Sequence, residues 1–143
     1  MLVTFCGHSS VSDATIVSNN LRQVISDLIA EGADEFYLGG YGEFDSMAAA
    51  AVRDAKKLHP HIRSMLVIPY MDREYNPQYY DGSVYPPLET VPRRFAISKR
   101  NEWMIEQADV VVTCVTHNWG GAATTLTYAR RKKKRIISVA PEK

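Results

Sequence analysis

The amino-acid sequence predicts an α/β protein: a single Rossmann-like, doubly wound domain with a mainly parallel five-stranded sheet and helices on both faces. One reason is that short apolar runs alternate along the chain with segments whose apolar residues recur at helical spacing. A second reason is that four of the five predicted strands are continuous apolar runs, which suits strands covered on both faces. Short connections between such elements favour right-handed parallel crossovers.

The predicted strands are short runs rich in β-branched and aromatic residues, and most are followed by glycine or polar residues. They cover residues 2–6, 35–38, 64–70, 110–115 and 135–140. A long segment rich in tyrosine and proline, 71–92, follows the third strand, and we expect a loop or lid there.

Four helices are predicted between these strands. The first begins near Ser12 or Asp13, either of which is a plausible N-cap, and Gly32 is its natural C-cap. The second is rich in alanine, spans 45–58 and ends before Pro60. The third runs from about 93 to 107, and the fourth follows the Gly-Gly pair at 120–121.

Composition and charge are those of an ordinary globular protein, and the length fits one domain, 1–143. The net charge of +1 gives no electrostatic reason to expect a nucleic acid or an anionic membrane as partner. The basic run at 130–135 falls at a helix C-terminus, where cations suit the helix dipole. The first residues lack a basic segment, and their apolar run is too short for a signal peptide or a membrane span, so we expect a cytoplasmic protein.

The two cysteines and the histidines give no sign of a disulfide or a metal site. Cys6 and Cys114 each end a predicted buried strand, and we interpret them as free thiols in a reducing cytosol. His59 and His61 lie at the end of a helix, and no set of His, Cys, Asp and Glu has the spacing of metal ligands. We therefore expect no metal and no cofactor.

Glycines and polar residues gather where the predicted strands end. The segments that follow the first four strands read GHSS, GGYGEFD, PYMDREY and THNWGG. In a doubly wound sheet these segments meet at one edge, where ligands bind at the switch in strand order. Glycine lets backbone N–H groups approach an anion, and a helix N-terminus adds a favourable dipole, so two Gly-Gly pairs at this edge indicate a phosphate site.

Three stretches of this sequence resemble a known family: YLGGYGEFD, RFAISKRNEWMIEQADVVVTCV and HNWGGAATTLTYARRKKKRII. Together they resemble the SLOG superfamily, the Rossmannoid group that contains the Lonely-guy proteins, and more closely its small stand-alone members from Firmicutes and their mobile elements. The resemblance covers nearly the whole chain. It implies a site for a nucleotide-derived molecule, because Lonely-guy enzymes cleave the N-glycosidic bond of nucleoside monophosphates. Other SLOG domains sense NAD-derived or ADP-ribose-like signals without cleaving them.

The family's first block, which faces phosphate, and its catalytic arginine both have counterparts in this chain. The block matches Gly39, Gly40 and Gly42, and the arginine, with a methionine four residues on, matches Arg100 and Met104. If the chain is an enzyme, the resemblance therefore makes Arg100 its catalytic arginine.

The family's second block reads Pro-Gly-Gly-x-Gly-Thr-x-x-Glu, and this chain departs from it at three positions. Trp119 replaces the proline, Ala123 the third glycine and Thr127 the catalytic glutamate. A threonine hydroxyl has no useful acidity, whereas a positioned acid or base typically contributes about 10²–10⁴ in rate. We therefore expect this stretch to hold a ligand rather than to cleave it.

Most candidate residues also have a purely structural interpretation. Arg94 and Arg100 are phosphate ligands or solvated surface arginines, and we expect loss of Arg100 to weaken binding by about 2 kcal/mol or more with little loss of folding stability. Asn101 bonds a ribose or caps a turn, His8 meets the ligand or is a loop histidine, and Asp45 bonds a ribose hydroxyl or caps the second helix. Tyrosines between 70 and 85 stack on a base or pack the loop.

The predicted function is binding of a nucleotide-derived small molecule, an NAD- or ADP-ribose-like or cyclic nucleotide signal, without turnover. The alternative is a Lonely-guy-like phosphoribohydrolase, with Glu102 or Asp45 as a replacement acid. We expect a homo-oligomer, at least a dimer, and a role such as sequestering an immune signal, as a phage or mobile-element protein would. The residues predicted to bind the ligand are Gly7, His8, Gly39, Gly40, Tyr41, Gly42, Asp45, Tyr70, Arg94, Arg100, Asn101, Asn118, Gly120, Gly121, Thr124 and Thr125.

Overall fold

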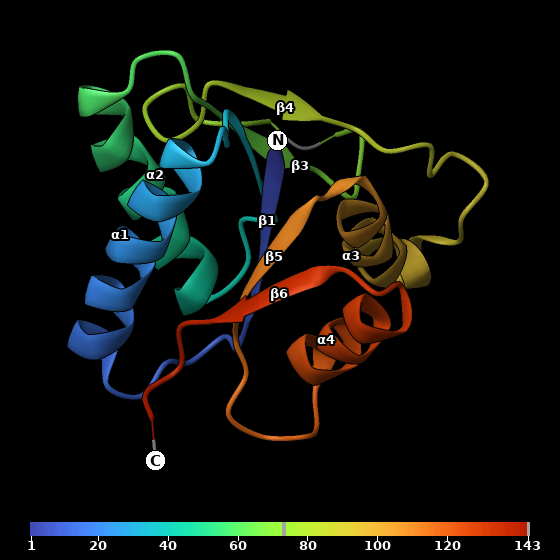
Figure 1. Ribbon diagram of the computed structural model, residues 1–143. Helices are drawn as coiled ribbons and strands as arrows, with labels where there is room; N and C mark the ends of the chain where they lie inside the picture. The colour runs from blue at the N-terminus through green and yellow to red at the C-terminus, as the bar shows by residue number, and fades with distance from the viewer. Residues whose placement is uncertain (73, 143) are drawn as a thin grey trace.

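The protein is a three-layer α/β structure in which a parallel sheet lies between two pairs of helices (Figure 1). The computed structural model describes residues 1–72 and 74–142. The strands are β1 (Leu2–Gly7), β2 (Glu35–Leu38), β3 (Arg63–Val67), β4 (Gly82–Val84), β5 (Val110–Cys114) and β6 (Arg135–Ser138). They pair in the order β4-β3-β2-β1-β5-β6, every pair parallel. The predicted class is confirmed, and the sheet has six strands where the sequence predicted five.

The helices are α1 (Ala14–Ala30), α2 (Glu43–Leu58), α3 (Ala96–Gln107) and α4 (Gly121–Arg131), with a short 3₁₀ turn η1 (Arg93–Phe95) before α3. The larger core packs α1 and α2 against the sheet and includes Leu21, Phe36 and Val112. The smaller core packs α3 and α4 against the other face and includes Ile105 and Leu126. Both faces of the central strands are therefore covered, which explains their continuous apolar runs.

The ends of α1 and α2 follow the sequence with one correction. At the end of α1, Gly32 adopts φ +112°, and the Ala33 N–H donates to the Leu28 carbonyl at 2.9 Å, which is a Schellman cap. Helix α2 begins at Glu43, two residues before the predicted start, with Gly42 as its N-cap. Asp45 is therefore not the N-cap but the third helical residue, and its carboxylate accepts a hydrogen bond from the Tyr41 N–H at 3.0 Å.

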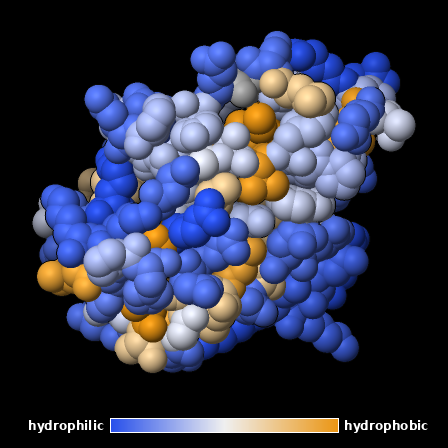
Figure 2. Space-filling model, turned by 90° about the horizontal axis from the view of Figure 1, so that it is seen from above, coloured by the Kyte–Doolittle hydropathy of each residue, from blue (hydrophilic) through white to orange (hydrophobic). Residues whose placement is uncertain are grey.

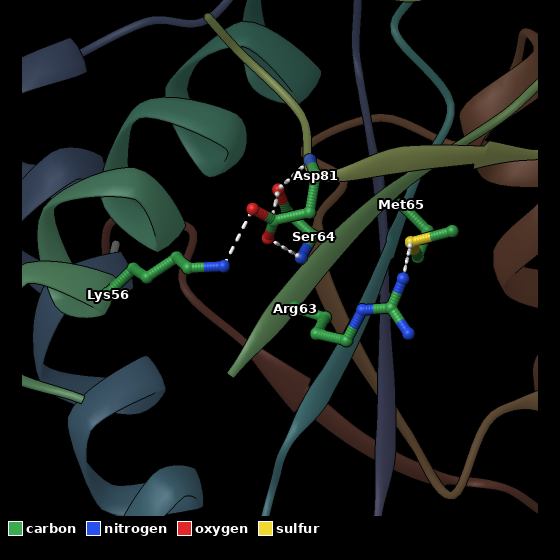
Figure 3. A network of polar contacts seen from close by, with 5 residues as sticks. All are labelled: Lys56, Arg63, Ser64, Met65 and Asp81. Atoms are coloured by element: carbon green, nitrogen blue, oxygen red, sulfur yellow. Dashed lines mark hydrogen bonds and ion pairs between the residues drawn. The ribbon is translucent and has the colours of Figure 1, made fainter. Parts of the chain in front are cut away.

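The strand that the sequence did not predict, β4, lies inside the expected loop 71–92 and forms the sheet edge beside β3. Asp81, just before β4, ties it there (Figure 3): its backbone N–H donates to the Ser64 carbonyl and its carboxylate accepts from the Ser64 N–H, both at 2.8 Å. The Lys56 ammonium of α2 completes the network with a 2.6 Å ion pair to Asp81. These contacts come from segments distant in sequence, so no local sequence pattern predicts the three-residue strand β4.

The face seen from above in Figure 2 is largely hydrophilic, with apolar side chains confined to isolated spots and a narrow band. Within 1–72 and 74–142, no helix combines the length and the apolar character that crossing a membrane requires.

The chain reverses its direction across the sheet between β1 and β5. From β1 it builds outward through β2 and β3 to β4, and α3 then carries it back to β5 on the other side of β1 (Figure 1). The last pairing of these two central strands is Gly7 with Cys114. The loops that follow lead to α1 on one face of the sheet and to α4 on the other. This is the switch point at which doubly wound sheets bind ligands.

Candidate functional site

A cleft of about 430 Å³ opens at the switch point. Its walls come from the end of β1 and the loop after it, the β2–α2 loop, the inner side of α3, and the segment between β5 and α4. The structure brings together ten of the sixteen residues predicted to bind a ligand: Gly7, His8, Gly39, Tyr41, Asp45, Arg100, Asn101, Gly120, Gly121 and Thr125. The other six do not line the cleft: Gly40, Gly42, Tyr70, Arg94, Asn118 and Thr124.

Among the described residues, Arg100 is the one arginine in the cleft wall. It is 2% exposed, so it is not the solvated surface residue of the structural alternative. Its Nη1 donates to the carbonyls of Gly39 at 2.9 Å and Val67 at 2.7 Å, and its Nε donates to Asn101 Oδ1 at 2.9 Å. Burial lowers the pKa of the guanidinium from its ordinary value. The group remains a cation, because arginine side chains are not deprotonated in proteins. Arg100 therefore fastens the ends of β2 and β3 together, and Asn101 holds it in place.

Asp45 is the carboxylate of the cleft wall, and Gly39 separates it from Arg100. A Cβ on Gly39 would lie 3.1 Å from Asp45 Oδ2 and 3.3 Å from Arg100 Nη2, so any side chain there would wedge between the two charged groups. Burial raises the pKa of Asp45 to about 6, against the opposing effects of the Tyr41 N–H and Arg100. A carboxyl that titrates near neutrality is chemically equipped to exchange a proton.

At the N-terminus of α2, which follows the first glycine block, carbonyls of the β1–α1 loop accept hydrogen bonds from the backbone N–H groups. The N–H of Glu43 donates to the Ser9 carbonyl at 3.0 Å, and that of Phe44 donates to the His8 carbonyl at 3.4 Å. Gly42 makes this possible, because a Cβ there would lie 2.7 Å from Ser9 Cα. The block predicted to face phosphate therefore receives the β1–α1 loop instead.

The N-terminus of α4 has the same backbone start but is open. Gly120 adopts φ 91° and ψ 175°, as Gly42 does with φ 89° and ψ 175°. The first intrahelical bond is donated by the Thr124 N–H to the Gly120 carbonyl. In the described part of the chain, no group accepts from the N–H groups of Gly121, Ala122 or Ala123. Such a cluster of free donors at a helix start is suited to an anion.

The threonine hydroxyls of α4 do not take the places predicted for them. Those of Thr124, Thr125 and Thr127 each donate to the carbonyl four residues earlier, at 2.9 to 3.1 Å, so their protons are committed within the helix. Thr127, which stands where the family has its catalytic glutamate, is exposed and does not line the cleft.

A stack of three aromatic rings forms part of the cleft wall, and two of its members escaped prediction. The rings of His8 and His117 lie 3.7 Å apart at an interplanar angle of 14°, and His117 and Trp119 lie 3.7 Å apart at 17°. The Thr116 N–H donates to His8 Nε2 at 2.9 Å, which places the proton of the neutral ring on Nδ1. Burial, followed by the neighbouring His117, lowers the pKa of His8 and favours that neutral form. The available signal for His117 and Trp119 was their position beside Gly120, directly after a strand.

The Nδ1 atom of His117 is buried and has no hydrogen-bond partner within the described residues. Buried polar atoms are nearly always satisfied, so an orphan beside a cleft indicates a partner that is not part of the protein.

Cys6 lies in the cleft wall as a buried, hydrogen-bonded thiol. Its thiol donates to the Ala122 carbonyl at 3.2 Å, and burial raises its pKa to about 12. Cys114 is also a free, buried thiol. No group of three or more His, Cys, Asp and Glu within 1–72 and 74–142 is placed to hold a metal ion.

Two predicted residues outside the cleft occupy the surface near η1. The Arg94 guanidinium lies over the Phe95 ring at 4.8 Å from its centroid, and the Tyr70 ring lies under Arg93 at 4.0 Å. Of the tyrosines predicted as stacking faces, Tyr79 and Tyr80 line a separate hollow of about 370 Å³ beside α2.

The strand order and the cleft at its switch point define a Rossmann-like domain of the doubly wound α/β class. Comparison with known proteins agrees. TM1055, a structural genomics target, superposes with a TM-score of 0.65 and 20% identity, over 94% of this chain and 71% of that one. The molybdenum cofactor carrier protein of Chlamydomonas reinhardtii superposes with a TM-score of 0.62 and 13% identity, over 96% and 75%. At these identities the likeness shows the fold alone.

DNA processing protein A of Helicobacter pylori, whose structure is described for its single-stranded DNA binding mode, superposes with a TM-score of 0.69 and 16% identity. The alignment covers 100% of this chain and 66% of that protein, so this chain spans about two thirds of its length.

In sequence, the chain is similar to the uncharacterised SPbeta prophage-derived protein YoqJ of Bacillus subtilis strain 168. The two are 26% identical in an alignment that covers 80% of this chain and 81% of YoqJ. No protein-family model matches the chain.

Proposed function

We propose that this chain is a SLOG-type protein that binds a phosphate-bearing, nucleotide-derived small molecule in the switch-point cleft and holds it without turnover. The observation that carries the proposal is the open start of α4, where the N–H groups of Gly121, Ala122 and Ala123 have no partner among the described residues. Gly120, Gly121 and Ala122 line the cleft, so an anion there would meet both the free donors and the positive end of the helix.

The charge distribution of the cleft supports an anionic ligand. Arg100 supplies a buried cation, and its Nη2 makes no hydrogen bond to a described residue. Asp45 opposes it with a carboxyl whose pKa is raised by burial to about 6. A ligand with a phosphate at the start of α4 and a polar sugar near Asp45 would give hydrogen-bond partners to the free N–H groups and to the carboxyl.

Capture without hydrolysis is supported at the position of the family's catalytic acid. Thr127 is exposed, and its hydroxyl proton is committed to the Ala123 carbonyl. The prophage origin of YoqJ fits a function in which ligand capture, for example of a nucleotide-derived immune signal, is itself the activity.

A second candidate function rests on Asp45. With a pKa raised to about 6 and a place in the cleft wall, this carboxyl could transfer a proton to the leaving base of a nucleoside monophosphate. Glu102, the other replacement acid, does not line the cleft and pairs with Lys99 at 3.3 Å.

The decisive variant is Gly121→Val. Gly121 lines the cleft, and a Cβ there meets nothing within 4 Å, so an added side chain has open space and should leave the fold intact. Calorimetry with AMP, ADP-ribose, NAD and inorganic phosphate should detect binding to the parent and none to Gly121→Val. The matched control is Thr124→Val, on the same helix turn but outside the cleft, which should bind as the parent does.

Three outcomes would contradict the proposal. A folded Gly121→Val protein with parental affinity would mean that the glycine pair is only a turn. Multiple turnover of AMP or NAD, followed by chromatography and lost in Asp45→Asn, would favour the hydrolase. Tighter binding of single-stranded DNA than of any small molecule would contradict the expectation of no nucleic-acid partner.

A further inference from the structure

Trp119 occupies an unusual place: its indole is rigidly stacked on one side and open on the other. The ring lies 3.7 Å from His117, yet the residue is 68% exposed, so the exposed area belongs to the edge and to the face turned away from His117. Trp119 also lines the cleft, together with Tyr41, which is 58% exposed. Large exposed aromatic side chains on a concave surface indicate a binding surface.

The indole is held at a fixed angle by the rings beneath it. His8 is anchored by the Thr116 N–H, His117 stacks on His8 at 14°, and Trp119 stacks on His117 at 17°. A ring that is already ordered loses little conformational entropy when a second ring stacks on it. The three-ring column is therefore a preorganised platform with room for a fourth ring.

The platform lies next to the open helix start. Trp119 precedes Gly121 by two residues, and two extended residues span at most about 7 Å. Both residues also line the same cleft, so one ligand with a planar ring, a sugar and a phosphate could reach the indole and the Gly121 N–H together. Phosphate alone would leave the indole uncovered, and a flat ring alone would leave the helix start unpaired.

On this basis we infer that Trp119 is the specificity-determining residue of the cleft: it stacks on the planar heterocycle of a base–ribose–phosphate ligand, as the fourth ring of the His8–His117–Trp119 column. The inference rests on the proposed function, because it takes the phosphate at α4 as given. It names a stacking residue that the tyrosine-rich segment was expected to supply.

The test compares two probes that share ribose and phosphate but differ in the base, AMP and ribose 5-phosphate. Base–aromatic stacking is worth about 1–3 kcal/mol per base, so Trp119→Ala should weaken AMP binding by about 5- to 150-fold and leave ribose 5-phosphate binding unchanged. Trp119→Phe keeps a stacking face and should retain most of the AMP affinity. Trp103 stacks on Tyr37 outside the cleft, so Trp103→Phe is the matched control and should change neither affinity.

A spectroscopic readout separates stacking from a general loss of structure. In the Trp103→Phe background Trp119 is the single tryptophan, and AMP should quench its fluorescence while ribose 5-phosphate should not. Equal affinity of the parent for the two probes, or an equal loss of both in Trp119→Ala, would overturn the stacking inference and leave the phosphate site standing. Failure of both probes to bind the parent would overturn the proposed function and this inference with it.

Discussion

Replacing Arg100 by alanine tests the part of the site where the structure departs most from the sequence-based expectation. The sequence predicts a loss of ligand affinity with little loss of folding stability. The structure instead places the guanidinium at 2% exposure, with hydrogen bonds to two carbonyls and to Asn101. Arg100→Ala should therefore destabilise the fold before any question of binding arises.

The magnitude follows from the groups left behind. An unpaired buried carbonyl costs about 1–3 kcal/mol, so the carbonyls of Gly39 and Val67 together account for roughly 2–6 kcal/mol. Removing the charge returns part of this, because burial already disfavours the guanidinium, as its lowered pKa shows. We expect a net loss of about 2–4 kcal/mol, a large share of the 5–15 kcal/mol that holds a typical domain folded.

Urea unfolding followed by circular dichroism measures this loss directly. Arg94→Ala is the matched control, because Arg94 is exposed and contacts only the Phe95 ring among described residues, and it should change stability by less than about 0.5 kcal/mol. Arg100→Lys should fall between the two, since an ammonium cannot reproduce three bonds in a fixed plane. If Arg100→Ala unfolds within about 1 kcal/mol of the parent, the two carbonyls do not depend on it and the reasoning fails.

Two further predictions concern the cleft wall. The folded-state pKa of Asp45 is about 6, above its ordinary 3.8, so its contribution is fully present below pH 3.8 and is lost as pH rises through 6. At pH 7.5 the ionised carboxylate therefore costs about 2–3 kcal/mol, and the stability of Asp45→Asn relative to the parent should rise by roughly that amount between pH 4 and 7.5 in urea titrations; a difference independent of pH would contradict the raised pKa. Gly7→Ala should lower the folding stability by at least about 1–3 kcal/mol, because its Cβ would lie 2.2 Å from the Phe44 ring. Gly121→Ala has open space around its Cβ and should be at least as stable as the parent. Equal melting temperatures for these two variants would show that Phe44 moves aside freely.

The fold was predictable because its signals are local. Continuous apolar runs mark strands buried on both faces, and helical spacing marks the helices, so class and element order follow without tertiary information. The strand β4 was not predictable, because three residues that include Gly82 become a strand only through Asp81 and its contacts with Ser64. The cleft was predictable as a place, since the carboxyl ends of parallel strands share one edge.

The roles of individual residues at that edge were less accessible, because long-range contacts decide them. The sequence does not reveal that carbonyls of the β1–α1 loop accept hydrogen bonds from the N–H groups at the start of α2. Nor does it reveal that the side chain of Arg100 is enclosed by the ends of β2 and β3. The stack of His8, His117 and Trp119 joins residues more than a hundred positions apart. Only His117 and Trp119 lie close together in sequence, and the position of Trp119 beside the Gly-Gly pair was the one signal that could have indicated a role in the site.

The starts of α2 and α4 differ in whether their backbone N–H groups have partners, and this difference orients a ligand in the cleft. Gly42 and Gly120 adopt the same backbone conformation. The carbonyls of His8 and Ser9 accept hydrogen bonds from the start of α2, whereas no described residue does so at the start of α4. A molecule that is charged at one end and flat at the other finds backbone donors along one rim only, and it cannot be bound equally well when reversed. The neutral carbonyls of the β1–α1 loop thus take the place of a ligand at one helix start, and the asymmetry that results fixes the orientation of a ligand in the cleft.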